Sequence, residues 1–145
     1  MLPARHLAAM RNKSGSGERE ERIAALAAEL EAAWEAMIPR IEENKQQRGE
    51  APEELTVEEK EQVAESDQAA GELDAELDEL ISQAESAADI VELMLPLYED
   101  EIRFWQDITR DPEFIHPQDK AVVDEVLTRQ QELVTLLAEY LADAG

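Results

Sequence analysis

The sequence predicts an all-α protein, an elongated antiparallel bundle of three long helices with coiled-coil-like seams. Three observations predict it. The chain of 145 residues contains 22 alanines but only six aromatic residues, and it is rich in glutamate and leucine, a composition typical of long helices. Apolar residues recur every three or four positions, which is the helical period. Capping signals and prolines mark the helix ends. We expect the middle helix to be kinked or split, so that three to four segments pack together.

The first 17 residues differ in charge from the rest of the chain. They contain Arg5, Arg11 and Lys13 and no acidic residue, whereas all 36 acidic residues lie beyond them. The stretch ends in Ser-Gly-Ser-Gly, a composition typical of flexible linkers. We therefore expect a flexible basic N-terminal arm (1–17) before a single acidic helical-bundle domain (18–145). The arm is expected to be disordered or to fold onto a partner or onto the acidic body, and a transit peptide is not expected.

The first long helix is expected from Glu18 to Lys45. Its apolar stripe consists of Ile23, Leu26, Leu30, Trp34, Met37 and Ile41. Pro39 lies inside this run, and we expect a kink there because Ile38 would be a poor N-cap for a new helix. After a loop over 46–55, Thr56 and Glu59 have the spacing of a capping box and predict the next helix start.

The second helical region carries a heptad pattern over five heptads. Its seam consists of Ala70, Leu73, Leu77, Leu80, Ala84, Ala87, Val91, Met94, Tyr98, Glu101, Trp105 and Ile108. Pro96 lies on the outer face of this pattern, so the seam is expected to continue past it with a bend. The flanking positions between Ile90 and Ile108 are also apolar, and we place the centre of the core there.

The last helix is expected to begin at Pro117, after a short loop that follows Asp111-Pro112. In this loop Glu113 and His116 have the Glu-x-x-His spacing of di-iron helical bundles. A complete site needs a second such motif, and the chain has only two histidines, so only a symmetric dimer would supply it. We interpret His116 as a capping residue of a turn and expect no metal and no other cofactor.

Several classes of function are disfavoured by the composition. The chain has no cysteine, and its serines have neither a nearby histidine nor a glycine elbow, so nucleophilic catalysis is not expected. We expect no enzyme activity. No apolar run approaches the roughly 20 residues that span a bilayer, so we expect no membrane partner. A formal net charge of −23 and a pI near 4.2 argue against direct binding to nucleic acid.

An acidic tract between Glu50 and Glu101 is the most distinctive feature of the sequence. From it we select a candidate acidic face for partner binding, which consists of Glu72, Asp74, Glu76, Asp78 and Glu79. Its charge could imitate nucleic acid, but a single helix over this tract carries one net charge per roughly 4.3 Å, against about 1.7 Å for duplex DNA. An ordinary solvated face or halophilic adaptation would explain the same composition.

A second candidate surface is apolar and aromatic. Met94, Tyr98, Phe104 and Trp105 lie on apolar stripes, where they are either core residues or anchors for a partner. Glu101 interrupts the seam and Gln130 interrupts the stripe of the last helix. Each of these two is a candidate polar specificity residue.

These observations favour a non-catalytic helical protein-interaction module, such as an adaptor, an assembly scaffold or a chaperone. Its partner is expected to be a protein with a basic surface, bound through apolar seams and acidic faces, and self-association is compatible with the same seams. The alternative is an acidic nucleic-acid mimic that occupies the basic surface of a DNA- or RNA-binding protein. The expected location is the cytoplasm, or a virion if the source is a phage.

Overall fold

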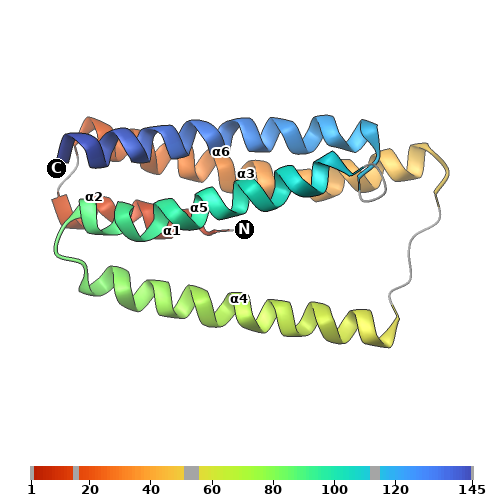
Figure 1. Cartoon of the computed structure of the whole chain (residues 1–145), viewed down its shortest axis with the longest axis horizontal. Helices are drawn as coiled ribbons and strands as arrows, with labels where there is room; N and C mark the ends of the chain where they lie inside the picture. The colour runs from red at the N-terminus through yellow and green to blue at the C-terminus, as the bar shows by residue number, and fades with distance from the viewer. Residues whose placement is uncertain (1, 15–16, 51–55, 112–114, 145) are drawn as a thin grey trace.

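A computed structural model describes residues 2–14, 17–50, 56–111 and 115–144. In these ranges the regular structure consists of helices alone, so the prediction of an all-α protein is confirmed. Two short helices come first, and four long ones follow (Figure 1). Their bounds are α1 Ala4–Ala8, α2 Met10–Ser14, α3 Glu18–Gln47, α4 Val57–Gln83, α5 Ala87–Arg110 and α6 Pro117–Ala144.

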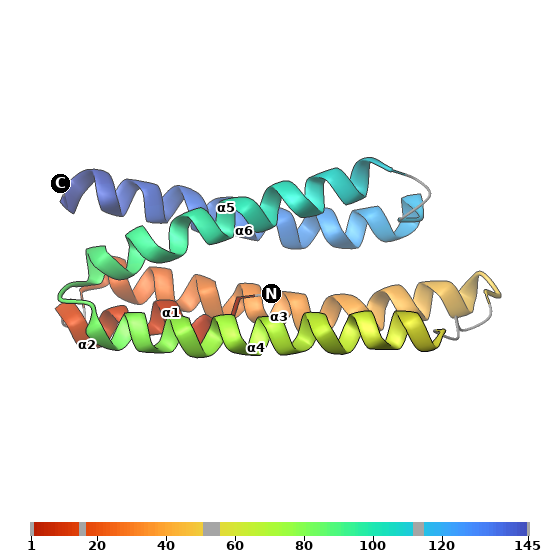
Figure 2. The same cartoon turned by 60° about the horizontal axis from the view of Figure 1, so that its bottom comes forward.

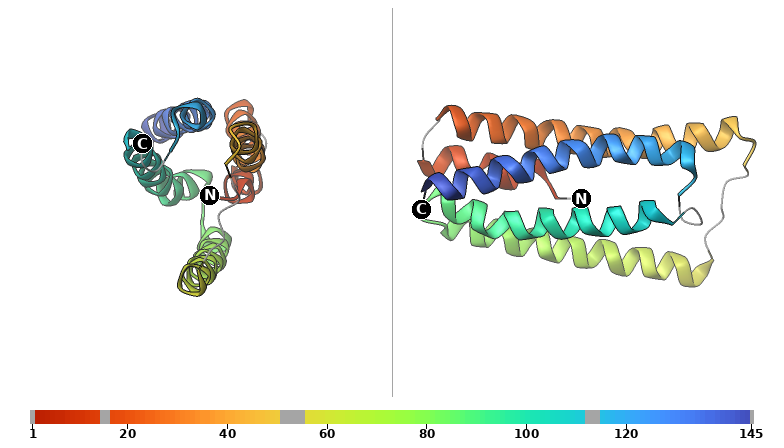
Figure 3. Two further views of the ribbon diagram at one scale, coloured as in Figure 1. Left: turned by 90° about the vertical axis from the view of Figure 1, so that its right-hand side faces the viewer. Right: turned by 45° about the horizontal axis from the view of Figure 1, so that its top comes forward.

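The main core lies among α3, α5 and α6. Helix α6 packs against both of the others and runs antiparallel to them (Figures 1 and 3). Val91 and Met94 of α5 and Leu133 and Leu137 of α6 are completely buried. Their recurrence at steps of three or four residues places them on one face of each helix, which explains why these two helices pack together.

Local signals define the helix ends largely as the sequence predicts. The Thr56 hydroxyl accepts a hydrogen bond from the amide of Glu59 at 3.1 Å, which confirms the predicted start of α4. His116 Nδ1 accepts from the amide of Gln118 at 3.1 Å, so the capping role predicted for this histidine is confirmed. Helices α3 and α5 continue through Pro39 and Pro96, respectively. Glu113 and the other residues of 112–114 lie outside the described ranges.

The predicted seam from Ala70 to Ile108 is not continuous. The chain leaves the helical conformation at Ala84, and Ser86 caps a new helix by accepting from the amide of Asp89 at 3.3 Å. As a result, α5 runs back antiparallel to α4 (Figure 2). The seam residues of α4 and α5 therefore belong to two separate helices. Among the described residues, α4 contributes only Leu77 of this seam to the buried core, and α5 contributes Ala87, Val91, Met94 and Tyr98.

The N-terminal segment also differs from the expected flexible arm. Residues 4–14 form α1 and α2, and His6, Leu7 and Met10 are completely or almost completely buried. The two helices pack against α3 and α5, and α1 also contacts α4. Of the alternatives considered for this segment, the structure shows folding onto the acidic body. We call residues 2–14 the arm. The boundary at residue 17 stays a prediction.

Candidate functional site

Helix α4 is the most exposed of the long helices. It carries ten acidic residues and one base, Lys60, which gives a net charge of −9. Only Leu77 and Ile81 are buried, and over the fully described stretch 57–76 no side chain is buried. Among the described residues, its contacts with the other helices are made chiefly to α1. Figure 2 shows α4 at the edge of the molecule, beside the arm.

The arm is attached to α4 by charged contacts around an apolar centre. The Arg5 guanidinium donates to both carboxylate oxygens of Asp78, at 3.3 and 3.1 Å. The buried His6 ring lies between two carboxylates, with Nδ1 3.2 Å from Asp78 Oδ1 and Nε2 3.6 Å from Asp74 Oδ1. Bidentate arginine–carboxylate pairing fixes orientation as well as charge. The basic arm is therefore bound to the acidic helix of its own chain.

A further contact lies at the C-terminal end of α4. The ammonium group of Lys13 donates to the carbonyl oxygen of Ser82 at 3.0 Å. The last turn of α4 contains no basic residue of its own, although a cation there is favourable because the helix dipole is negative at this end. Lys13 supplies that missing cation from the arm.

The other side of the arm is attached to α3. The backbone amide of Ala4 donates to the Glu31 carboxylate at 2.7 Å, so Glu31 satisfies one of the free amides at the start of α1. Arg11 pairs with Glu21 at 2.9 Å. The arm thus runs antiparallel to α3 and joins it to α4.

The pKa values of the arm pair follow from this geometry. The hydrogen bond from Arg5, reinforced by its charge, lowers the pKa of Asp78. The same hydrogen bond raises the pKa of Arg5. Both groups are consequently charged at neutral pH.

The structure divides the predicted acidic face into two. Asp74 and Asp78 face the arm, whereas Glu72, Glu76 and Glu79 are exposed. The helical rotation of 100° per residue places these three glutamates on the side of α4 opposite the arm. The outer face of α4, as we define it, consists of Glu58, Glu61, Glu65, Glu72, Glu76 and Glu79.

The predicted aromatic and apolar set is also divided. Met94 and Tyr98 are 0% and 1% exposed and belong to the core. Trp105 is half-buried and packs against Trp34 of α3 with ring centroids 5.0 Å apart. Phe104 packs edge-on against Trp105 and remains 59% exposed. Of the four, Phe104 is therefore the one with most of its surface available to a partner.

The two polar residues that interrupt the seams lie next to each other. The Gln130 amide group donates to Glu101 Oε1 at 3.3 Å and to the carbonyl oxygen of Tyr98 at 3.2 Å. Burial raises the pKa of Glu101. These contacts explain both interruptions as one polar pair between α5 and α6, which is a structural role.

A polar cluster that the sequence did not reveal joins α3 to α6. Asp119 is almost completely buried and accepts from Arg48 at 3.0 and 3.3 Å and from Asn44 at 3.1 Å. Burial raises the pKa of Asp119, but these hydrogen bonds outweigh it and the net shift is downward. The sequence gives no local sign of this cluster, because the partners of Asp119 lie 71 and 75 residues away in the chain.

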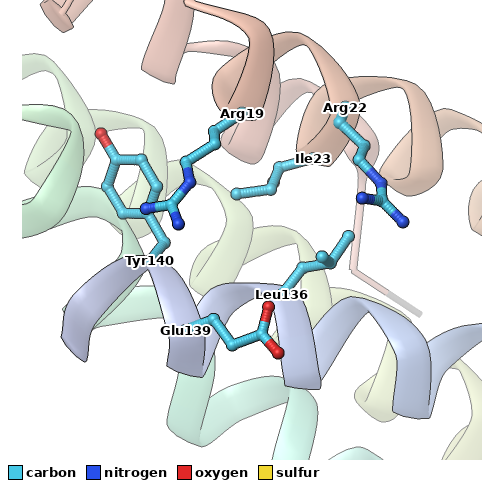
Figure 4. A pocket seen from close by; sticks show the side chains of 6 residues that line it. All are labelled: Arg19, Arg22, Ile23, Leu136, Glu139 and Tyr140. Carbon is cyan, nitrogen blue, oxygen red and sulfur yellow. The ribbon is translucent and has the colours of Figure 1, made fainter. Parts of the chain in front are cut away.

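The described surface has several hollows of different size. Figure 4 shows a cavity of about 140 Å³ between α3 and α6, with Ile23 and Leu136 among its lining and Arg19, Arg22 and Glu139 around them. That volume is below the range of ordinary ligand sites, about 300–1,000 Å³. Two shallower hollows fall within this range: one of about 390 Å³ between the arm and α4, beside His6 and Ile81, and one of about 580 Å³ between α3 and α6, beside Leu26 and Thr135. Within the described residues, acidic and histidine side chains form no cluster suited to a metal ion. No helix among those residues is long and apolar enough to cross a membrane.

Comparisons with known protein families, curated proteins and solved structures give no match to this chain. Function therefore has to be inferred from the residues of the chain and their arrangement.

Proposed function

We propose that this protein is a non-catalytic helical interaction module, an adaptor, assembly scaffold or chaperone, which binds a protein with a basic surface through α4. One observation carries the proposal. Helix α4 has a net charge of −9 and buries no side chain over residues 57–76, whereas α3, α5 and α6 each contribute many buried side chains to the core. A helix that packs so little against its own protein gains little stability from tertiary contacts. Presentation of α4 to a partner protein would account for its exposure.

The chemistry of the exposed stretch supports a protein partner. Carboxylates occupy its outer face, and Val63 and Leu73 are exposed at 47% and 40%. Carboxylates steer a basic surface into contact, and apolar side chains then provide contact area that is insensitive to salt. The arm illustrates the same combination, because Arg5 pairs with Asp78 of α4 while Leu7 and Met10 are buried.

Charge spacing favours this proposal over the nucleic-acid mimic. The turn at Ala84 limits the acidic rod to the 27 residues of α4, or about 40 Å at 1.5 Å per residue. Nine net charges over that length correspond to one per roughly 4.5 Å, wider than the spacing of about 3.4 Å in a single strand. The mimic is kept as an outcome of the experiment below.

The test is a pull-down from the native lysate with the full chain as bait, eluted first with salt and then with denaturant. The comparison variant is Glu72→Gln/Glu76→Gln/Glu79→Gln, which neutralises part of the outer face of α4. Its control is Glu132→Gln/Glu139→Gln, which removes exposed carboxylates from α6. We expect one or two stoichiometric partners that resist salt and that the α4 variant captures less well than the control variant.

Two results would contradict the proposal. Equal capture by the α4 variant and by the wild type would show that the acidic face is not used. Release of many nucleic-acid-binding proteins by salt alone would favour the mimic, because purely electrostatic binding is screened by ions.

A further inference from the structure

Burial declines in the same way along three helices that surround the arm. Each helix has a position that recurs every seven residues and therefore stays on one face. In α3, Ala24 is 4% exposed and Ile38 is 59% exposed. In α5, Ile90 is completely buried and Phe104 is 59% exposed. These two pairs lie 14 residues apart, or about 21 Å along the helix axis.

Helix α4 repeats the pattern in the opposite chain direction. Leu77 is 2% exposed, and Val63, two heptads earlier, is 47% exposed. The direction is reversed because α4 runs antiparallel to α3 and α5 (Figure 2). At these heptad positions, all three helices are thus buried at the end where the arm lies and exposed at the other end.

The buried part of these three helix faces ends where α1 begins. The first residue of α1, Ala4, donates its amide to Glu31, and Ile38 occupies the same heptad position as Glu31 one heptad further along α3. The N-terminus lies near the middle of the long axis, and α4 extends well beyond it (Figure 1). The described arm leaves Ile38, Phe104 and Val63 exposed. We call these three residues the continuation face.

The charge around this face specifies its occupant. Residues 57–73 of α4 carry six acids and one base; four of these acids belong to the outer face, and Asp67 lies on the side of α4 that faces the arm. Asp67 occupies the heptad position of Asp74, the carboxylate nearest His6 Nε2, one heptad earlier. A second copy of α4 would bring nine further net negative charges, and like charges at such a contact repel. A helix with the chemistry of the arm, apolar on one side and basic beside it, would meet complementary groups instead.

We propose that the continuation face receives a short amphipathic helix of a partner protein, basic beside its apolar side and seated end to end with the arm. This proposal rests on the proposed function in that the partner is basic. It adds that the partner contacts the inner side of α4 together with α3 and α5, rather than the outer face alone. The apolar side of the partner packs on Ile38, Phe104 and Val63, and its cations pair with carboxylates such as Asp67.

The experiment uses a defined probe and the full chain. The probe is a 14-residue synthetic helix with leucines at steps of three and four residues and arginines between them. Its affinity is measured by isothermal titration calorimetry. The face variant is Ile38→Ser/Phe104→Ala, which changes two exposed side chains. The control variant is Leu80→Ser, which changes a leucine that is 42% exposed, on a neighbouring row of α4 and nearer to its C-terminal end.

We expect 1:1 binding of the probe, weakened at least about tenfold by the face variant, as for loss of interface anchors, and unchanged in the control variant. A probe with glutamates in place of arginines should not bind. Amide exchange of the arm around Leu7 should not increase when the probe binds, because the probe lies beyond the arm. Circular dichroism of both variants shows that they remain folded.

Four results would overturn the inference. The first two are absence of probe binding and equal affinity of the probe for the face variant and the wild type. The third is faster exchange of the arm amides, which would mean that the probe displaces the arm. The fourth is self-association of the protein that the face variant abolishes, which would assign the face to a second copy. Each leaves the pull-down result standing, so a partner captured through the outer face would uphold the proposed function while this inference fails.

Discussion

The bundle of α3, α5 and α6 and the acidic helix α4 carry similar apolar patterns but differ in what covers them. In α5, Val91 and Met94 are completely buried. In α4, Leu73 and Leu80 occupy comparable heptad positions and are 40% and 42% exposed. Heptad spacing shows which residues share a face, and it does not show whether another helix covers that face. The difference lies in the flanks, which are apolar in much of α5 and acidic in α4.

The helices of the two regions are also stabilised by different interactions. Burial of a wide apolar surface stabilises α5. Helix α4 relies on alanine, glutamate, glutamine and leucine, which have high helix propensity, on the Thr56 cap, and on arm contacts at its C-terminal end. The bundle is therefore expected to be the stable unit, and α4 the part whose stability depends on the arm.

The largest expected effect comes from a charge placed in the bundle core. Met94→Asp should lower the free energy of unfolding by about 4 kcal/mol or more, because it buries an unpaired carboxylate. Leu73→Asp in α4 should change it by less than about 1 kcal/mol, because the side chain is already partly in water. Urea denaturation followed by circular dichroism measures both values. Equal losses would show that α4 is packed as tightly as the bundle.

The next effect concerns the arm. Leu7→Ala removes a completely buried side chain and should destabilise arm docking by about 2–4 kcal/mol. Hydrogen exchange should then accelerate in the arm and around Leu77 and Ile81, and much less in α6. The exposed Asn12→Ala serves as the control. Unchanged exchange around Leu77 would mean that the arm does not hold α4.

A smaller effect is expected at the polar cluster between α3 and α6. Asp119→Asn should cost about 1 kcal/mol by weakening the hydrogen bonds from Arg48 and Asn44. Because the pKa of Asp119 is lowered in the folded state, its contribution is present above the ordinary aspartate pKa. It is lost as pH falls through the lower folded value. Thermal melts between pH 5 and 2 should show a shallower loss for the variant than for the wild type.

The contribution of Glu101 to stability should depend on pH in the opposite direction to that of Asp119, and more weakly. Burial raises its pKa in the folded protein, so the charged form is destabilising and mild acid relieves it. Lowering the pH from 7 towards 5 should therefore raise the melting temperature. Glu101→Gln should increase stability at pH 7 by less than about 1 kcal/mol and flatten this rise. A variant that melts lower at pH 7 would contradict this reasoning.

The smallest effect is that of salt. At a net charge of −23, like charges repel one another, and moderate salt should raise the melting temperature slightly. The same salt screens the exposed pair of Arg5 and Asp78, so exchange of the arm amides should accelerate while the bundle gains stability. A melting temperature that falls with added salt would count against self-repulsion.

Local features of this protein could be predicted because their causes lie within a few residues. The Thr56 capping box, the His116 cap, and the passage of α3 through Pro39 depend on neighbours in the sequence. The turn between α4 and α5 was less accessible. The heptad pattern continues through Ala84 and Ala87, so periodicity alone did not reveal that Ser86 starts a new helix.

The candidate site shows the same division. Sequence reasoning identified the acidic tract and the basic arm, because charge is read directly from residue types. It grouped Asp74 with Glu72, Glu76 and Glu79, although the arm contacts only the side of α4 that carries Asp74 and Asp78. Contacts across 73 residues, such as Arg5 with Asp78, leave no local signal.

By itself the sequence determined that this protein is helical, where α3, α4 and α6 begin, and that its charge is concentrated in one acidic tract beside a basic arm. Spacing, capping and composition act locally, which is why they were sufficient for these features. The tertiary structure decided that Met94 and Tyr98 are core, that Phe104 is exposed, and that the arm covers only one end of the faces around it. Those outcomes depend on which helices meet in space, and amphipathic helices of similar pattern can be buried or left uncovered.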